Sequence, residues 1–436
     1  MSMQGFLARD DRAITQVYFR DPVVMERGEG VFLYDIEGKR YLDFSAHYSS
    51  CCLGHCNKKL ITAIEAQMSK LISVSAQFSS MERIYLAEKL LSLTNGKYAK
   101  VLFGCTGSDA IEFAIKAVKH HKKGGNIITF WRGYHGATAG SAAATGKAET
   151  IQIDENISDL LPGGFIHVSP PYCYRCDYEK KHPDCDLFCL RYIKKRVAQD
   201  GCDNIAGVII EPVQAAGGVI VPPEGYMEKL KQLCEEMNSL LIFDEVVTGI
   251  GRTGTMFACE HWGIYPDILV AGKALTGGYI PGSAVLMKKD IAESMDKLTL
   301  HGHTHSAYPL MCASALANLK IIEQEKLCDN AHIVGKLLHT RLLGLKSISD
   351  KIGDVRGIGL LQGIEIVCGN GSKNADFIFA EKLYSNLLKA GVITELESSY
   401  RLESSVLVLH PPLVLTKEQA EEAVEIIRNV LINLLK

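Results

Sequence analysis

From about residue 60 onward, segments with helical periodicity alternate with short runs of almost uniformly apolar residues. Such runs are too short for helices, and buried parallel strands of an α/β sheet have this pattern. A further strand, SAVLM at 283–287, is predicted after a stretch rich in Gly and Pro. The other predicted strands are VLF at 101–103, NIITF at 126–130, GVII at 207–210, LLIF at 240–243 and DILV at 267–270. The pattern therefore predicts an α/β fold with a mostly parallel sheet.

Changes of pattern divide the chain into three predicted parts. Residues 30–55 have apolar and aromatic residues between turn signals, as in a short meander, and we assign 1–55 to an N-terminal segment that packs with the small domain. Residues 56–310 form the large domain, and 311–436 form a smaller α/β C-terminal domain. The C-terminal part has long helical stretches around DVRGIGLLQGIEIV and ends in the helix EQAEEAVEIIRNVLINLLK.

The composition excludes several classes of protein. The chain has 436 residues, with 47 Lys and Arg against 50 Asp and Glu, and a formal net charge of −3. This balance, without basic blocks, argues against nucleic-acid binding. No run reaches the roughly 18 apolar residues of a transmembrane helix, and the charged N-terminus lacks the core of a signal peptide. We expect a soluble cytoplasmic protein with no nucleic-acid or membrane partner.

Three predicted strands are followed by residues that could bind a ligand or take part in catalysis. After VLF, the turn containing Gly107 and Ser108 opens a helix, whose free N–H groups suit a phosphate, although Thr106 or Ser108 could simply cap that helix. After LLIF comes Asp244, and an acid at a half-buried strand end needs a cationic partner or caps a helix. After DILV comes Lys273 between small residues, where desolvation would lower the pKa of its amine, unless it is a surface lysine.

The coincidence of these groups at the ends of strands in one sheet favours a cofactor site. Ligands of open α/β sheets bind at the carboxyl ends of the strands. A phosphate cradle, an acid and an amine match the phosphate, the protonated ring nitrogen and the aldehyde of pyridoxal phosphate. The residues therefore predict a pyridoxal-phosphate site.

Nearly the whole chain resembles the class III aminotransferases, which are fold-type I pyridoxal-phosphate enzymes. The matching stretches occur in the family's order: DIEGKRYLDF, FGCTGSDAIEFAIKAVK, RGYHGATAGS, IIEPVQAAGGVIVPPEGY, LLIFDEVVTGIGRTG, PDILVAGKALTGGYIPGSAVL, HGHTHSAYPLMCASALA, VRGIGLLQGIEIV and HPPLVLTKEQ. The resemblance implies an ω-aminotransferase-like fold with a large domain and a smaller α/β C-terminal domain.

The resemblance also implies roles for individual residues. Lys273 would bind the cofactor covalently and move the proton, and Asp244 would pair with the pyridine nitrogen. The remaining implied contacts of the cofactor are Gly107 and Ser108 with the phosphate, Tyr134 and Val246 with the ring faces, Glu211 and Gln214 at the ring's polar edge, and Thr304 with the phosphate of a neighbouring subunit. The last contact implies a homodimer or a dimer of dimers.

The chain departs from the family pattern where many members bind an α-carboxylate. Val408 stands where those members have an arginine three residues before the Pro-Pro-Leu turn. Arg401 is at the position of the mobile arginine of ω-amine:pyruvate transaminases, or else it is a solvated loop charge. Tyr48 is similar to an aromatic residue that lines the substrate pocket, with core packing as the alternative. Cys105 and Asp109 replace the usual Asn and Glu around the phosphate turn, and His305 follows Thr304.

Four cysteines form a compact group in PPYCYRCDYEKKHPDCDLFCL, within a predicted insertion at 170–190. Cys173, Cys176, Cys185 and Cys189 have the spacing C-x2-C-x8-C-x3-C. Their number and closeness suit a structural zinc site, and free thiols, disulfides or an iron–sulfur cluster are the alternatives.

These observations predict a pyridoxal-phosphate-dependent aminotransferase. It would move an amino group between an amine or amino acid and a keto acid by a ping-pong mechanism. A racemase or epimerase, a decarboxylase, or a lyase acting on an amino-phosphate or amino-phosphonate compound would use the same scaffold and the same first proton transfer.

Overall fold

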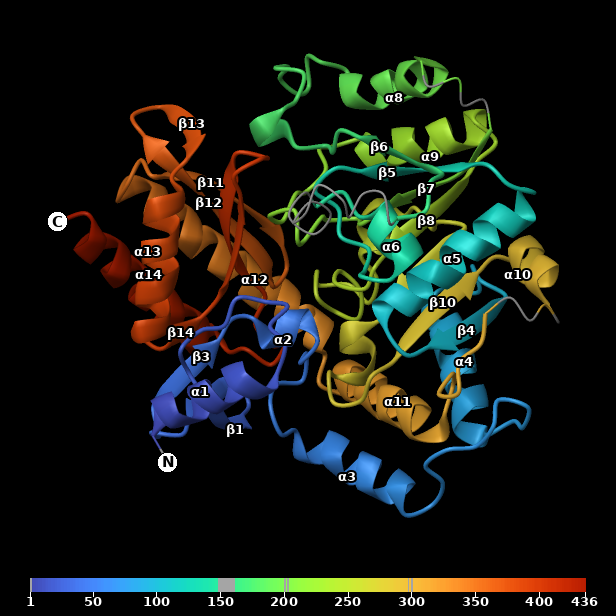
Figure 1. The fold of residues 1–436 in the computed structure, drawn as a ribbon, viewed down its shortest axis with the longest axis horizontal. Coiled ribbons are helices and arrows are strands. Elements are labelled where there is room, and N and C mark those ends of the chain that lie inside the picture. The colour runs from blue at the N-terminus through green and yellow to red at the C-terminus, as the bar shows by residue number, and fades with distance from the viewer. Residues whose placement is uncertain (1, 148–160, 200, 202–203, 297, 299–300) are drawn as a thin grey trace.

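Three β-sheets organise the part of the chain that the structure, a computed structural model, describes: residues 2–147, 161–199, 201, 204–296, 298 and 301–436. Figure 1 shows the largest sheet and its helices beside a second body, which is built from the C-terminal third and the N-terminal strands. The long helix α11 (Pro309–Gln324) leads from the large sheet towards the C-terminal elements. The site described below lies on the large sheet, on the side where its parallel strands end.

The large sheet has the strand order β4-β10-β9-β8-β7-β5-β6. Neighbouring strands among β5 to β9 are parallel, and β10 is antiparallel to both β9 and β4. All of the strands expected in this region are present, and the mostly parallel sheet is confirmed. Their bounds are β4 Lys100–Gly104, β5 Asn126–Phe130, β6 Phe165–Val168, β7 Ile205–Ile210, β8 Leu240–Asp244, β9 Ile268–Ala271 and β10 Ser283–Met287.

Helices cover both faces of this sheet, which is why its strands are apolar throughout. Successive strand residues face opposite sides. Ile242 and Val270 join one core cluster with α5 and α10, whereas Phe243 and Leu269 join a second cluster with α8, α9 and α11. The covering helices are α5 (Gly107–His121), α10 (Lys289–Met295), α8 (Phe188–Gln199) and α9 (Tyr226–Glu236).

The C-terminal sheet is antiparallel, with the order β11-β12-β16-β15 and with β13 paired to β12. Helices α12, α13 and α14 contact its strands or one another. The bounds are β11 Ile352–Ile358, β12 Leu361–Gly369, β13 Ser372–Ala375, β15 Glu395–Ser399, β16 Ser404–Leu409, α12 Leu327–Leu343, α13 Phe377–Lys389 and α14 Lys417–Leu434.

The N-terminal strands form a third sheet, β1-β2-β3-β14, in which β3 pairs in parallel with β14 from the C-terminal part. The bounds are β1 Met25–Glu29, β2 Phe32–Asp35, β3 Arg40–Asp43 and β14 Val392–Ile393. The remaining elements are α1 Met3–Ala13, α2 Ala46–Ser49, α3 Lys58–Met68, α4 Met81–Leu93, α6 Ala139–Ala144, η2 Cys173–Arg175, η3 Ala258–Trp262, η4 Lys273–Thr276 and η5 Gly344–Ser347. Within the described ranges, none of the helices combines the length and the apolar character needed to cross a membrane.

Candidate active site

The ends of parallel strands bring the predicted cofactor residues to one edge of the sheet. Asp244 is the last residue of β8, and Lys273 begins η4 two residues after the end of its neighbour β9. Parallel neighbours end on the same side of a sheet, so both groups lie on that side. Glu211 follows β7 and the segment 131–137 follows β5 on this same edge.

The predicted phosphate turn packs against Val246. A Cβ built on Gly107 would lie 3.0 Å from Val246 Cγ1, and one built on Gly272, the residue before Lys273, would lie 3.4 Å from the same atom. Thr106 also caps α5, because its Oγ1 accepts a hydrogen bond from Asp109 N at 3.1 Å. Thr106 therefore caps the helix, and the other N–H groups of the first turn, which have no intrahelical partner, remain suited to a phosphate.

The segment that carries Tyr134 lies against the same turn. Ala137 N donates a hydrogen bond to Ser108 Oγ at 3.1 Å. Gly136 has φ 136°, and a Cβ there would lie 2.5 Å from Ser108 Oγ, so this close approach requires glycine. The half-buried Tyr134 is thereby held near the start of α5.

Asp244 is buried and has a defined partner. Only 3% of the residue is exposed, and its Oδ2 lies 2.8 Å from His135 Nδ1 while its Oδ1 accepts from Val246 N at 3.1 Å. A buried acid requires such partners. His135 was absent from the predicted site residues, although it stands next to Tyr134 in the RGYHG motif, which was the available signal.

Glu211 and Gln214 connect the site to the Tyr134 segment. Glu211 accepts hydrogen bonds from Tyr134 N at 2.9 Å and from Ala215 N at 3.1 Å, and burial raises the pKa of its carboxyl to about 7. Gln214 Nε2 donates to Trp131 O at 3.3 Å. Both side chains therefore help to place the segment that carries the ring-stacking candidate.

Loss of solvation lowers the pKa of the Lys273 amine, against the opposing charges of Glu395, Glu211 and Asp244. Glu395 was not predicted, because it comes from β15 of the C-terminal sheet. Its carboxylate is 2.9 Å from His410 Nε2 and accepts from Ser45 Oγ at 2.8 Å. The lysine thus faces acids from both bodies of the molecule.

The residues present fit pyridoxal phosphate. In the described part of the chain, the buried atoms His135 Nε2 and Gln214 Oε1 have no hydrogen-bond partner, and such orphaned atoms are expected beside a polar ligand. An amine with a lowered pKa, a buried carboxylate and free helix N–H groups supply partners for an aldehyde, a ring nitrogen and a phosphate.

The remaining residues singled out in the sequence differ in exposure. Tyr48 is 49% exposed on a turn in which Ala46 to Ser49 all have positive φ, and the charges of Glu395 and Glu397 act on its hydroxyl. Arg401 is exposed on the turn between β15 and β16. Val408 is buried in β16, packed in an apolar cluster. Thr304 is exposed on this chain.

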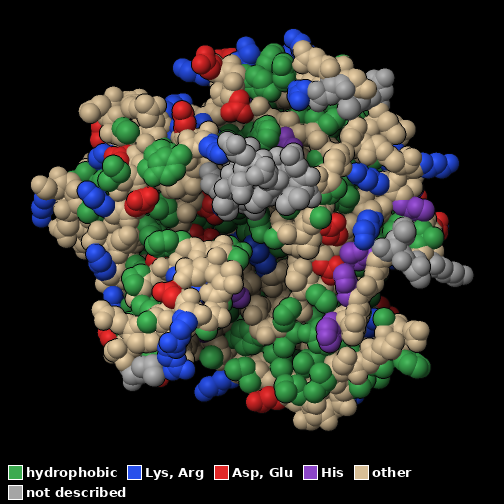
Figure 2. All heavy atoms as spheres, in the orientation of Figure 1, with side chains coloured by type: hydrophobic (Ala, Val, Ile, Leu, Met, Phe, Trp, Pro, Cys, Tyr) green, Lys and Arg blue, Asp and Glu red, His purple; other side chains and the backbone are tan. Residues whose placement is uncertain are grey.

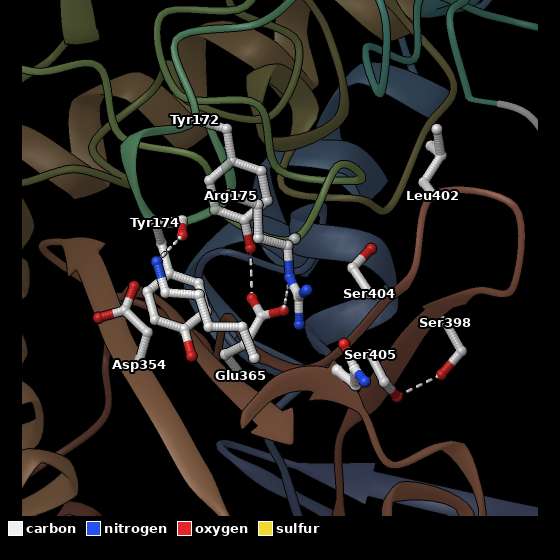
Figure 3. Close-up of polar contacts among 12 residues, drawn as sticks. Tyr172, Tyr174, Arg175, Asp354, Glu365, Ser398, Leu402, Ser404 and Ser405 are labelled. Atoms are coloured by element: carbon white, nitrogen blue, oxygen red, sulfur yellow. Dashed lines mark hydrogen bonds and ion pairs between the residues drawn. The ribbon is translucent and has the colours of Figure 1, made fainter. Parts of the chain in front are cut away.

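Arg132 anchors the hairpin that carries Arg401. Its guanidinium donates to Leu402 O and to Ser404 Oγ, each at 2.6 Å, and burial lowers its pKa. Figure 3 shows Leu402 and Ser404 on this hairpin, with Ser398 and Ser405 joined across it at 2.6 Å. Arg132 was not predicted, since its partners lie far away in the sequence.

The start of the cysteine-rich insertion is bonded to the C-terminal sheet. Figure 3 shows Tyr172 and Arg175 pointing at Glu365 of β12, and Arg175 Nε lies 2.6 Å from that carboxylate. Arg356 Nη2 lies 2.8 Å from Glu365 as well. The insertion therefore connects the two bodies.

The four cysteines of the insertion, all in the described part of the chain, act on one another's charge, but no three of their sulfur atoms lie within 4.8 Å of one another. All four thiols are free, and burial and the neighbouring thiols Cys173, Cys176 and Cys185 raise the pKa of the Cys189 thiol to about 12. Within the described ranges, the one group of at least three His, Cys, Asp or Glu residues whose ligand atoms lie within 4.8 Å of one another is Asp109, His301 and His303. The zinc prediction for Cys173, Cys176, Cys185 and Cys189 has no support from the structure.

Comparison with known proteins agrees with this geometry. The pattern of the Aminotransferase class-III family matches residues 15–431. An acetylornithine aminotransferase of Methanocaldococcus jannaschii is 34% identical, over 99% of this chain and 98% of that protein. An alanine/serine racemase of Pyrococcus horikoshii is 36% identical, over 94% and 86%. The structure of a thermostable (S)-enantioselective omega-transaminase from Thermomicrobium roseum superposes with a TM-score of 0.91, at 32% identity and 99% coverage of each chain.

The chain belongs to the class III aminotransferases. Its fold is that of the pyridoxal-phosphate-dependent transaminases of fold type I, which confirms the predicted family and fold. The roles of the individual site residues stay predictions.

Proposed function

We propose that this protein transfers an amino group from an amine or amino acid to a keto acid in two half-reactions, with pyridoxal phosphate as cofactor. The observation that carries the proposal is the convergence of Lys273, Asp244 and the Gly107–Ser108 turn, which follow strands β9, β8 and β4 of one sheet. Family membership supports the same conclusion.

The residues that would hold the cofactor follow from their contacts. Asp244, held in place by His135 and the Val246 N–H, would pair with the ring nitrogen, and the start of α5 would receive the phosphate. Tyr134 and Val246 would cover the two ring faces, and Glu211 and Gln214 would lie at the polar edge. When bound, pyridoxal phosphate supplies the electron sink that makes the α-proton of the substrate acidic.

Lys273 would bind the cofactor and exchange the proton. Its lowered pKa increases the fraction of neutral amine, which is the form that can attack a carbonyl or accept a proton. Nζ would also be the group that takes the α-proton of the substrate and returns it elsewhere. Because the same pocket must then accept a keto acid, the kinetics should be ping-pong.

The substrate carboxylate would be bound by Arg401, with Tyr48 lining the pocket. Val408 offers no charge, whereas Arg401 lies on a hairpin whose base carries Glu395, one of the acids that act on Lys273. A guanidinium on an exposed turn can bind a carboxylate and withdraw when the other substrate has none.

A second copy of this chain would complete the assembly as a homodimer or dimer of dimers. Exposed apolar side chains gather around α4 and the preceding loop: Met68, Ile72, Phe78, Met81, Ile84 and Tyr85. Figure 2 shows hydrophobic side chains collected on the lower part of one face. Such a patch is typical of an interface. The exposed Thr304 would reach the phosphate held by the partner copy.

One experiment separates this function from racemisation, which the racemase relatives favour. The holoenzyme is incubated with single 15N-labelled, α-deuterated amines or amino acids and a panel of keto acids, and the products are analysed by mass spectrometry and chiral chromatography. Transfer of 15N to a keto acid is expected. Loss of deuterium with loss of optical purity, but without 15N transfer to any acceptor, would instead establish a racemase.

A further inference from the structure

A second cluster of metal-ligating side chains lies behind the phosphate turn, outside the proposed cofactor contacts. Asp109 Oδ1 is 2.6 Å from His301 Nε2 and also contacts His303 Nε2. The two Nε2 atoms are 3.1 Å apart. One carboxylate oxygen and two imidazole nitrogens therefore face a common point.

The helix start holds the Asp109 carboxylate in place. Its Oδ2 accepts from Cys105 N at 2.8 Å, and its own N–H donates to Thr106 Oγ1. The second oxygen is thereby aimed at the histidines. Only 9% of the side chain is exposed, so this charge requires a cationic partner.

The two histidines approach from one short segment. The His301 ring lies 5.6 Å from the Phe113 ring on α5 and is almost fully buried. The His303 ring stands at 88° to it and is 43% exposed. Two Nε2 atoms that face each other repel if both present a lone pair. Both lone pairs can instead point at a cation that lies between them.

We propose that Asp109, His301 and His303 bind a divalent transition metal of the zinc type, with water completing the coordination on the exposed side of His303. Two imidazoles and one carboxylate with an open position suit Zn²⁺, and also Co²⁺ or Ni²⁺. The metal would fasten the 301–306 segment, which includes Thr304, to the start of α5. This site does not depend on the proposed transaminase reaction.

Without a metal, the contact between Lys116 and His301 determines which nitrogen of the His301 ring carries the proton. Its Nζ is 3.2 Å from His301 Nδ1, and a lysine donating there leaves the imidazole proton on Nε2, directed at Asp109. Metal binding at Nε2 requires this proton to move to Nδ1 and Lys116 to turn away. Lys116 is exposed, so it can do so. Lys116→Gln offers an acceptor for the Nδ1 proton and should therefore strengthen metal binding.

The test titrates chelator-treated holoenzyme with Zn²⁺ by calorimetry, with elemental analysis of the dialysed product. All variants carry Cys173→Ser and Cys176→Ser, which removes part of the competing thiol group. One Zn²⁺ per chain is expected. His303→Gln and His301→Gln should each weaken binding at least about tenfold, and Lys116→Gln should strengthen it. His305→Gln is the matched control, because its ring contacts Tyr308 instead of the cluster, and its affinity should stay unchanged.

Cobalt provides an independent readout. Co²⁺ at this site should give weak visible absorption bands without an intense thiolate-to-cobalt band in the near ultraviolet. Three results would each overturn the proposal: no bound Zn²⁺ at micromolar concentrations, equal affinity in His303→Gln and His305→Gln, or a thiolate band that persists in all variants.

Discussion

The amine of Lys273 is subject to two opposing influences. Loss of solvation lowers its pKa, and the charges of Glu395, Glu211 and Asp244 raise it, with desolvation the larger effect. Desolvation dominates because η4 places the side chain at the base of a site between two bodies of the molecule. The residue is therefore suited to alternate between a charged and a neutral amine.

Lys273→Ala should abolish turnover, because no other amine replaces the one that binds the cofactor and moves the proton. The cofactor should still bind without a covalent bond, through the Gly107–Ser108 turn and Asp244. Borohydride treatment followed by mass spectrometry measures the bond directly. Covalent fixation and normal turnover in the alanine variant would show that a different lysine acts.

Asp244→Asn should leave the protein folded and reduce kcat/KM on the order of a hundredfold or more. A neutral amide cannot hold the ring nitrogen protonated, and each lost pKa unit of that pairing corresponds to about 1.4 kcal/mol. Steady-state kinetics and a thermal unfolding curve check the two parts. Near-normal turnover with intact folding would place the ring nitrogen elsewhere.

At the scale of elements, the β15–β16 hairpin connects the C-terminal sheet to the candidate active site. Its base carries Glu395, whose charge acts on Lys273, and its inner strand, β16, contains the buried Val408. Arg132 binds the hairpin near its turn. An anchored hairpin with an exposed tip can present Arg401 without moving the acids at its base.

Arg401→Ala should raise the KM for the keto acid by roughly ten- to a hundredfold, since a charge-assisted contact is worth about 1.5–3 kcal/mol. Half-reactions with amines that lack a carboxylate should change little. Glu403→Gln, on the same turn, serves as the control. An equal effect on both half-reactions would make Arg401 structural, and no effect would mean that the carboxylate is bound elsewhere.

Glu245 links the end of β8 to the start of η3. Its carboxylate accepts from Ala258 N at 2.5 Å and Cys259 N at 2.8 Å, and burial raises its pKa from 4.5 to about 7. Between these values the folded state binds more protons than the unfolded state. The free energy of unfolding should therefore fall as the pH rises from about 4.5 to about 7.

Glu245→Gln removes this titration, so its stability should depend less steeply on pH in that window. Each pKa unit contributes about 1.4 kcal/mol to the difference between the two proteins. Urea unfolding at a series of pH values, with both proteins measured in parallel, isolates the contribution of Glu245 from that of Glu211. Parallel curves would contradict the raised pKa.

At the scale of the whole molecule, a buried ion cluster joins the two bodies beside the active site. Glu365 of the C-terminal sheet contacts Arg356 on its own sheet and Tyr172 and Arg175 from the insertion (Figure 3). The Glu365 side chain is fully buried, so its negative charge depends on these partners for stabilisation.

Glu365→Ala should lower the stability of the protein by about 3–5 kcal/mol, because it leaves the largely buried Arg175 without its carboxylate and Arg356 with only Asp354 as an acidic partner among the described residues. The matched control is Glu236→Ala, which breaks the exposed pair with Lys194 and should cost less than about 1 kcal/mol. Denaturant unfolding measures both, and limited proteolysis of the 170–190 insertion should accelerate only in Glu365→Ala. Equal losses would show that the cluster does not stabilise the molecule.

The strands of the large sheet and the groups at their ends could be predicted because both are local in sequence. An apolar run followed by Asp244 or Lys273 indicates that this residue stands at the end of a strand. Because parallel strands end at the same edge of the sheet, the two residues are expected to lie together. His135 lay within a recognised motif but offered no sign of its partner Asp244. The apolar pattern of β10 likewise gave no indication that this strand runs antiparallel to its neighbours.

The sequence by itself determined the family, the mostly parallel sheet and the chemical groups at its edge, because periodicity and strand-end chemistry are properties of neighbouring residues. Tertiary structure alone decided which distant groups face one another. It placed Glu395 beside Lys273, Arg132 against the Arg401 hairpin, and His301 and His303 against Asp109. Within the described residues, it brought no three sulfur atoms of the cysteine quartet within 4.8 Å of one another, despite the compact spacing. Spacing limits the distance between side chains, whereas packing between separate elements determines whether they meet.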